Sequence, residues 1–225
     1  KKTQFALVNK KFKKIFKKRN FSSKLVIPNK KHLQIIKQKI KKNYSELNIS
    51  DENIGFVYAF SKLIKINEKI FIQSIKSFVG LPHRHEIFLK KNNIVFINDS
   101  KATSFEAAKY ALSKSENIFW ILGGLPKKND KIILSKIKSN IIKCYLIGKN
   151  INFFKKQIKN KINFSITKNF KMTLIEILKD IKSLNKKNNT ILLSPAAASY
   201  DQFKNFENRG DEFKKWSKYY ARKFI

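Results

Sequence analysis

The chain has 225 residues, of which 42% are hydrophobic and 29% charged, which is enough for one medium domain or two small ones with real cores. Fifty Lys and Arg against 15 Asp and Glu give a formal net charge of +35, and the hydrophobic fraction excludes a disordered basic tail. The single cysteine, Cys144, excludes a disulfide framework and a multi-cysteine zinc site, and no apolar run reaches the roughly 18 residues that span a bilayer.

The first eighty residues predict a short β/α segment followed by helices. Apolar spacing and turn residues predict strands over 5–8 and 24–27, and helices over 10–18, 32–44, 51–66 and 68–78. Gly80-Leu81-Pro82 then interrupts the helical pattern, so we place a domain boundary after residue 79.

Beyond this boundary, apolar strands alternate with helical stretches, an order that predicts an α/β, Rossmann-like domain with a mostly parallel sheet. A hairpin is expected from 86–89 and 94–97. Further strands are expected over 118–122, 142–147, 162–166 and 190–193, and helices over 104–113, 130–137, 151–158, 172–183 and 202–220. Ligands of such sheets bind at the carboxyl ends of the strands, so the site is expected there.

The net charge is of the size found in nucleic-acid-binding proteins. However, only Arg19, Arg84, Arg209 and Arg222 are arginines, and the lysines are spread along the chain among abundant Asn and Ile, as A/T-rich codons would give. No zinc-finger, RNA-recognition or leucine-zipper pattern is present. We therefore interpret the lysines as a dispersed, solvated surface and expect no specific nucleic acid as partner.

Three strand-to-helix junctions carry unusual residues: 98–103 (NDSKAT), 122–127 (LGGLPK) and 193–199 (LSPAAAS). In the first, Ser100 or Thr103 would cap a helix whose amides, with the neighbouring lysine, suit a carboxylate or phosphate. In the second, paired glycines permit close approach to a ligand, with a simple tight turn as the alternative. In the third, Ser199 suits the N-cap of the next helix. Together they predict one anion-binding crevice at a single sheet edge.

Other chemistries find less support. The six glycines, at 55, 80, 123, 124, 148 and 210, fit neither a phosphate-binding P-loop nor a G-x-G-x-x-G dinucleotide motif. His83 and His85 lack a matching third metal ligand and are interpreted as residues at the start of a strand. Cys144 lies in an apolar strand and is interpreted as a core residue.

In this order, 80–84 (GLPHR), the three junction motifs, 201–206 (DQFKNF) and 209–213 (RGDEF) closely resemble the D-glutamate-adding branch of the Mur ligase family. The resemblance extends from Gly80 to about Trp216 and is weaker over residues 1–79. It implies two parts: a partial central ATPase domain over 1–79 and the family's C-terminal, glutamate-binding domain over 80–225.

The resemblance also implies a function: ATP-dependent amide formation in bacterial peptidoglycan synthesis, a cytoplasmic step with ATP and Mg2+ as cofactors. An acyl phosphate formed on UDP-MurNAc-L-alanine would be attacked by the amine of D-glutamate. The residues carried over are Lys101 near the reacting groups, Thr103, Lys127, Ser199 and Phe206 on D-glutamate, and Asn53, Arg84 and Asp99 on ATP.

The sequence departs from the family pattern in several places. The UDP-binding domain, the P-loop and the magnesium ligands of the central domain would lie before Lys1. The family's His-Asn-x-x-Asn stretch reads Glu52-Asn53-Ile54-Gly55-Phe56, so only Asn53 matches, and Ser104 and Pro126 replace a family Asn and Gly. We therefore expect that the chain cannot turn over ATP alone. We also expect a monomer without a membrane partner. The alternative is a lysine-rich nucleic-acid-binding module derived from a Mur ligase.

Overall fold

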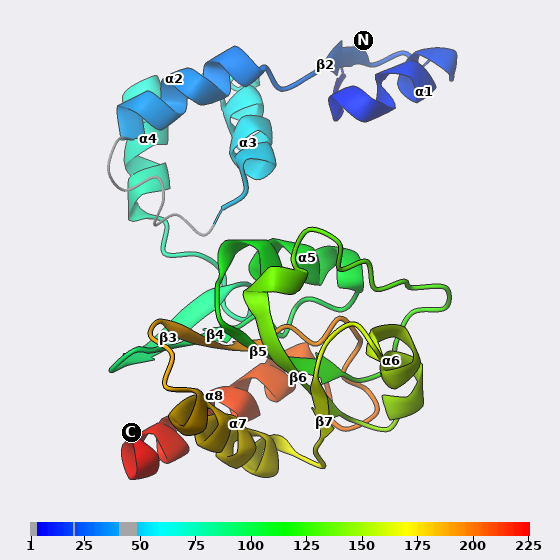
Figure 1. Cartoon of the computed structure of the whole chain (residues 1–225). Helices are drawn as coiled ribbons and strands as arrows, with labels where there is room; N and C mark the ends of the chain where they lie inside the picture. Colours follow the sequence, from blue (N-terminus) through cyan, green and yellow to red (C-terminus); the bar gives the residue numbers. More distant parts are fainter. Residues whose placement is uncertain (1–3, 20, 41–48) are drawn as a thin grey trace. The chain divides into compact units, whose positions relative to one another are not determined.

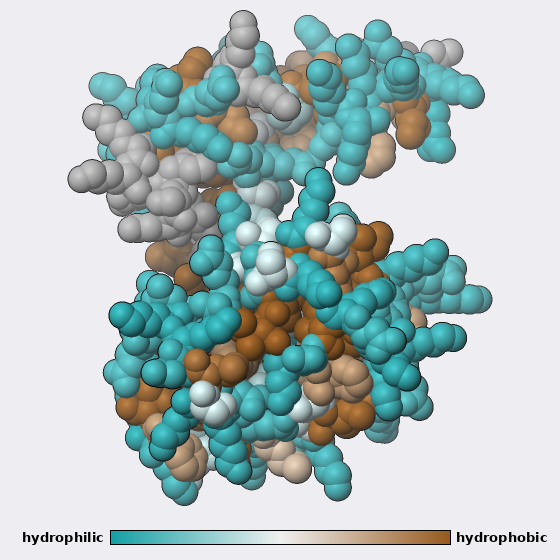
Figure 2. Space-filling view, in the orientation of Figure 1, coloured by the Kyte–Doolittle hydropathy of each residue, from teal (hydrophilic) through white to brown (hydrophobic). Residues whose placement is uncertain are grey.

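The computed structural model describes residues 4–19, 21–40 and 49–225 and divides the chain into two compact units, Lys1–Gly80 and Leu81–Ile225 (Figure 1). We call them the N-terminal and the C-terminal unit. Figure 2 shows one face of each unit, and hydrophilic side chains cover most of it, with apolar patches among these side chains. Within the described residues, no helix combines the length and the apolar composition that crossing a membrane requires.

The N-terminal unit has a parallel strand pair and three longer helices. Ser50 caps α3 by accepting the amide of Asn53, and Asn67 caps α4 by accepting the amide of Lys69. The predicted elements are confirmed except for residues 41–44, which lie outside the described part of the chain. The elements are β1 (Phe5–Leu7), a 3₁₀ turn (Lys10–Phe12), α1 (Lys13–Lys18), β2 (Lys24–Val26), α2 (Lys30–Ile40), α3 (Asp51–Leu63) and α4 (Glu68–Ser77).

The C-terminal unit contains a six-stranded sheet in the order β3-β4-β8-β5-β6-β7. Only the β3–β4 hairpin is antiparallel, and the other four neighbouring pairs are parallel. The predicted α/β class with a mostly parallel sheet is therefore confirmed. The strands are β3 (Glu86–Lys91), β4 (Ile94–Asn98), β5 (Ile118–Gly123), β6 (Ile141–Ile147), β7 (Phe164–Ile166) and β8 (Asn189–Leu193).

Helices cover both faces of this sheet because its central strands are apolar on both sides. In β5, Trp120 and Leu122 pack towards α5 and α6, whereas Phe119 and Ile121 pack towards α7 and α8. Cys144 of β6 is fully buried in the first of these cores, as predicted, and burial raises the pKa of its thiol. The helices are α5 (Phe105–Lys114), α6 (Ile151–Ile158), α7 (Phe170–Leu184) and α8 (Phe206–Phe224).

The helix predicted over 130–137 is wrong. Residues 131–134 belong to no helix or strand, and the segment ends in a turn over 135–137 and a 3₁₀ helix over Lys138–Asn140. Gln157 of α6 fixes this course, since its side chain accepts the Ile132 amide at 2.8 Å and donates to the Asp130 carbonyl at 3.3 Å. The apolar residues whose spacing suggested a helix enter the core from an irregular segment instead.

Two predicted helix starts are also wrong. The N-cap of α5 is Ser104, which accepts the Ala107 amide, rather than Ser100 or Thr103. The N-cap of α8 is Asn205, which accepts the Asn208 amide, rather than Ser199. The Ser199 carbonyl instead closes a separate turn that precedes the helix. None of the three hydroxyl residues Ser100, Thr103 and Ser199 is therefore an N-cap, and the Ser100 hydroxyl instead donates to the Phe206 carbonyl.

Candidate functional site

The site edge is set by three adjacent parallel strands, β4, β8 and β5. Because parallel strands share a carboxyl edge, the loops that follow them emerge side by side. These loops are 99–104 after β4, 124–130 after β5 and 194–205 after β8. We call them the β4, β5 and β8 loops, and they contain all three junction motifs of the sequence.

Hydrogen bonds join the three loops into one structure. Leu125 and Ala198 exchange both backbone hydrogen bonds, at 2.8 and 2.9 Å, which ties the β5 loop to the β8 loop. The Asp130 carboxylate accepts the Phe105 amide at 2.9 Å, which ties the β5 loop to the start of α5. The helix N-terminus that sequence reasoning assigned to a bound anion is therefore occupied, at its first amide, by the protein's own carboxylate.

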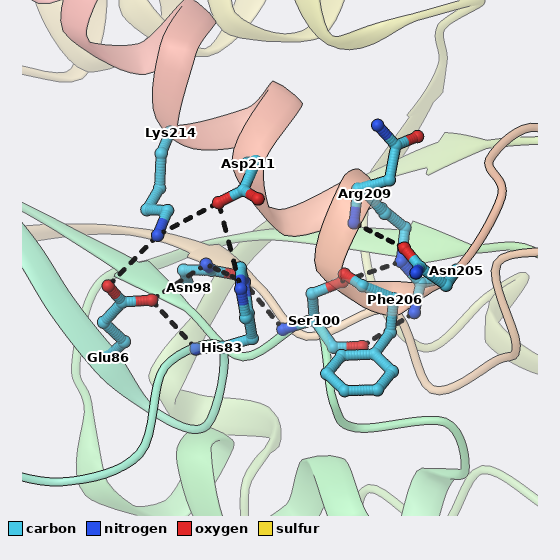
Figure 3. A network of polar contacts seen from close by, with 10 residues as sticks. His83, Glu86, Asn98, Ser100, Asn205, Phe206, Arg209, Asp211 and Lys214 are labelled. Carbon is cyan, nitrogen blue, oxygen red and sulfur yellow. Dashed lines mark hydrogen bonds and ion pairs between the residues drawn. The ribbon is translucent and has the colours of Figure 1, made fainter.

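Arg209, on α8, ties the β4 loop to the β8 loop (Figure 3). The side chain is fully buried, and its guanidinium donates to Ser100 Oγ at 2.9 Å, to the Ser100 carbonyl at 2.8 Å and to the Ala197 carbonyl at 3.0 Å. The Ser100 hydroxyl in turn donates to the Phe206 carbonyl at 2.8 Å. Arg209 belongs to the 209–213 motif, which by itself predicts no role for it. The rarity of arginine in this lysine-rich chain was the one sequence feature that singled it out.

The predicted ligand residues lie on these loops. The Lys101 ammonium sits 3.7 Å from the ring centroid of Phe206, so a cation–π contact joins the β4 loop to the first residue of α8. Lys127 is exposed in a turn that the Asp130 amide closes on its carbonyl at 3.1 Å. Thr103 is half-buried in the β4 loop, and Ser199 is buried in the β8 loop. Two exposed lysines and two hydroxyl residues thus lie on the loops of one sheet edge.

The paired glycines serve the packing of the chain's own backbone. A Cβ on Gly123 would lie 2.0 Å from the Ile147 carbonyl oxygen, and one on Gly124 would lie 2.3 Å from the Ala198 carbonyl oxygen. Both glycines also have positive φ values, +142° and +132°. The close approach expected for a ligand is therefore made by β6 and by the β8 loop.

Asp99 is almost entirely buried at the end of β4. Its carboxylate accepts the His85 amide at 3.0 Å and the Ser194 hydroxyl at 2.6 Å. Burial raises its pKa to about 6, opposed by these hydrogen bonds and by the charge of Arg84. Arg84 is exposed. Asn53, the third predicted ATP residue, is also exposed but belongs to α3 of the N-terminal unit.

A second polar network fixes the start of β3 to α8 (Figure 3). His83 approaches Asn98 Nδ2 through Nδ1 at 3.0 Å, and Glu86 accepts hydrogen bonds from the His83 amide and from Asn98. Lys214 pairs with Glu86 at 3.3 Å and with Asp211 at 3.2 Å. His83 and His85 lie just before β3, as expected, and the structure shows that both are buried. Separately, no group of three His, Cys, Asp or Glu among the described residues could jointly hold a metal.

The curated relatives agree with the resemblance. The chain is 37% identical over 201 residues to the UDP-N-acetylmuramoylalanine–D-glutamate ligase of Wolbachia sp. subsp. Brugia malayi, covering 84% of this chain and 39% of the relative. It is 41% identical over 167 residues to the ligase of that name from Rickettsia felis, covering 74% of this chain and 37% of the relative. The chain belongs to the Mur ligase family. It spans about two fifths of the length of the curated relatives it matches.

Solved structures support the Mur ligase fold. The UDP-N-acetylmuramate-alanine ligase MurC of Thermotoga maritima matches with a TM-score of 0.52 at 13% identity, over 76% of this chain and 37% of that chain. The MurF ligase of Thermotoga maritima, solved in complex with ADP, matches with a TM-score of 0.50 at 14% identity, over 77% of this chain and 38% of that chain. No family model matches the chain.

In this Mur ligase chain, four of the eight predicted site residues lie on the three linked loops, Lys101, Thr103, Lys127 and Ser199, and Phe206 at the start of α8 contacts Lys101. Asp99 begins the β4 loop but, with Arg84, belongs to a separate cluster around His85 and Ser194. Asn53 lies in the other unit.

Proposed function

We propose that the C-terminal unit is the D-glutamate-binding part of a ligase that joins D-glutamate to UDP-MurNAc-L-alanine in peptidoglycan synthesis. The observation that carries this proposal is the junction of the β4, β5 and β8 loops, which presents Lys101 and Lys127 at one sheet edge. A small dicarboxylate needs opposing cations and hydroxyl or amide donors at short range, and these loops offer both.

Each ligand residue has a distinct task in this proposal. Lys127, Thr103 and Ser199 hold the carboxylates of D-glutamate, partly through backbone amides, and Phe206 borders the carbon chain. The contact of Lys101 with Phe206 directs its ammonium to the reacting groups. In the reaction, the D-glutamate nitrogen forms a bond to the activated alanyl carbon, and phosphate leaves with the electron pair of the broken C–O bond.

ATP and Mg2+ are the proposed cofactors, but the residues of this chain do not form a binding site for them. The described residues contain no cluster of three metal-ligating side chains, the sequence contains no P-loop, and both Asp99 oxygens are engaged internally. We therefore propose that the main contacts to ATP and Mg2+ come from residues outside these 225. The ligase would act as a monomer in the bacterial cytoplasm, without a membrane or a specific nucleic acid as partner.

A D-glutamate titration followed by NMR tests the binding proposal. We expect D-glutamate, and not L-glutamate, to shift resonances of the three loops. Lys127→Ala should weaken this binding about tenfold or more, because it removes a charge-assisted contact. Lys128→Ala, which alters the adjacent exposed lysine, is the matched control and should bind as the wild type does. Loops that ignore D-glutamate but respond to DNA at roughly 0.2 M salt, where non-specific contacts weaken, would instead favour the nucleic-acid module.

A coupled phosphate-release assay tests the expected dependence on further residues. With ATP, Mg2+, UDP-MurNAc-L-alanine and D-glutamate present, these 225 residues alone should release no phosphate above background, since they lack a P-loop. Supplying the remaining ligase residues, in one chain or in trans, should give turnover. Turnover by the 225 residues alone would contradict this prediction.

A further inference from the structure

The buried guanidinium of Arg209 lies where the three loops meet. It bonds to Ser100 of the β4 loop and to Ala197 of the β8 loop. On the β5 side, a Cβ placed on Gly124 would come within 3.2 Å of Arg209 Nη1, so the guanidinium also packs directly against the β5 loop. One side chain of α8 therefore touches all three loops, which carry every proposed ligand residue except Phe206 of α8 itself.

The positions of these ligand residues follow from the Arg209 contacts. Ser100 directly precedes Lys101, and Ala197 lies two residues before Ser199. The Ser100 hydroxyl, which accepts from Arg209 Nε, also donates to the carbonyl of Phe206, the residue on which Lys101 stacks. A shift of the guanidinium would move the cation, the buried hydroxyl and the aromatic ring relative to one another.

The charge of Arg209 is not balanced within the described residues by a carboxylate that accepts its hydrogen bonds. All of its acceptors are neutral: two carbonyls and one hydroxyl. Asp201 is the acid whose charge acts on it, but the Asp201 carboxylate is engaged with the Lys149 amide at 2.9 Å. Burial lowers the pKa of Arg209 to about 10, which leaves it cationic at neutral pH. Arg209 thus has a nearby acid but no direct ion pair among the described residues, and a buried charge without a direct partner is costly.

We infer that Arg209 is the positioning residue of the diacid site: it holds the β4 and β8 loops in their binding arrangement, and the bound diacid adds negative charge near a guanidinium that has no direct ion pair. This inference rests on the proposed function, because it takes D-glutamate as the diacid. Arg209 is not itself placed against the ligand, and it acts through Ser100, Ala197 and Phe206.

Binding measurements on three arginine variants test this role. Arg209→Met keeps the apolar stem and removes both the charge and the hydrogen bonds, whereas Arg209→Lys keeps the charge but cannot reach three acceptors. Arg222→Met, an exposed arginine on the same helix, is the matched control. We expect the affinity for D-glutamate to fall about 30-fold or more in Arg209→Met, to fall less in Arg209→Lys and to stay unchanged in Arg222→Met.

A second ligand separates the charge from mere stability. D-Glutamine has the shape of D-glutamate without the second negative charge. The wild type should prefer D-glutamate, and Arg209→Met should lose about tenfold of this preference, which partial unfolding alone would not change because it weakens both ligands equally. If Arg209→Met does not fold, Ser100→Ala breaks the hydroxyl link between Arg209 and Phe206 while keeping the Ser100 carbonyl, and it should also weaken D-glutamate binding.

The possible outcomes are distinct. If folded Arg209 variants bind D-glutamate within twofold of the wild type and keep its preference over D-glutamine, the positioning role is refuted while the proposed function stands. If Arg209→Met does not fold, Arg209→Lys and Ser100→Ala variants that both bind as the wild type does refute it equally. If the wild type itself binds neither amino acid, the proposed function fails first.

Discussion

Gly123→Ala is expected to destabilise the C-terminal unit by about 3–5 kcal/mol. The new Cβ would lie 2.0 Å from the Ile147 carbonyl oxygen, and the backbone φ of +142° is unfavourable for any side chain. Gly123 pairs with Ile147 at the end of the β5–β6 ladder, and both strands are buried there. Relief would require β5 and β6 to separate, so the clash cannot be absorbed by a flexible side chain.

Urea denaturation followed by tryptophan fluorescence measures this effect, because Trp120 and Trp216 both lie in the C-terminal unit. The contrasting variant is Gly55→Ala inside α3, whose new Cβ would meet nothing closer than Pro28 Cβ at 3.4 Å. It should stabilise the N-terminal unit by roughly 0.5–1 kcal/mol, as followed by circular dichroism. An unchanged urea midpoint for Gly123→Ala would contradict the prediction, because it would show that β5 and β6 separate at little cost in free energy.

Asp99→Asn is expected to remove a pH-dependent loss of stability of about 3 kcal/mol. The pKa of Asp99 rises on folding from its ordinary 3.8 to about 6, because the carboxylate is buried. The folded state therefore holds this proton between pH 3.8 and 6 when the unfolded state has lost it. As the pH rises through this interval, the free energy of unfolding falls, and above about pH 6 the full loss is present.

The measurement is the difference between the two proteins in free energy of unfolding, taken at pH 4 and at pH 7. Asparagine is neutral at both values, and its amide can accept from the His85 amide and donate to Ser194, so the local contacts are retained. The variant should gain roughly 2.5 kcal/mol relative to the wild type between these pH values, since about 0.5 kcal/mol of the loss is already present at pH 4. The control Glu106→Gln, at an exposed carboxylate, should follow the wild type. Parallel curves for Asp99→Asn and the wild type would contradict the prediction.

The strands of the C-terminal unit could be predicted because their burial on both faces leaves uninterrupted apolar runs, as in β5 and β8. The same logic failed at Ile132, Leu134 and Ile137. Their burial comes from an irregular segment fixed by Gln157, a partner on a later helix, so local spacing resembled a helix by coincidence. Helix starts failed for a related reason, since several hydroxyl and amide side chains compete for each cap and only the tertiary path selects one.

The location of the candidate site could be predicted because parallel strands place their following loops at one edge. Arg209 could not, because a charged residue in an amphipathic helix is normally a solvated one. Its partner Ser100 lies 109 residues away in the sequence, and nothing local indicates that the guanidinium is buried against it. The role of Gly124 was missed for the same reason, since the carbonyl that excludes a Cβ belongs to Ala198.

The strand order has a consequence for how this molecule is made. β8, which begins at Asn189, is the last strand in the described part of the chain, yet it pairs with β4 on one side and with β5 on the other. Until the ribosome has released β8, the edges of β4 and β5 lack their partner, and such bare edges invite pairing with other chains. The junction of the β4, β5 and β8 loops and the completed sheet thus arise in one late event, so a nascent chain has no partly formed version of this junction.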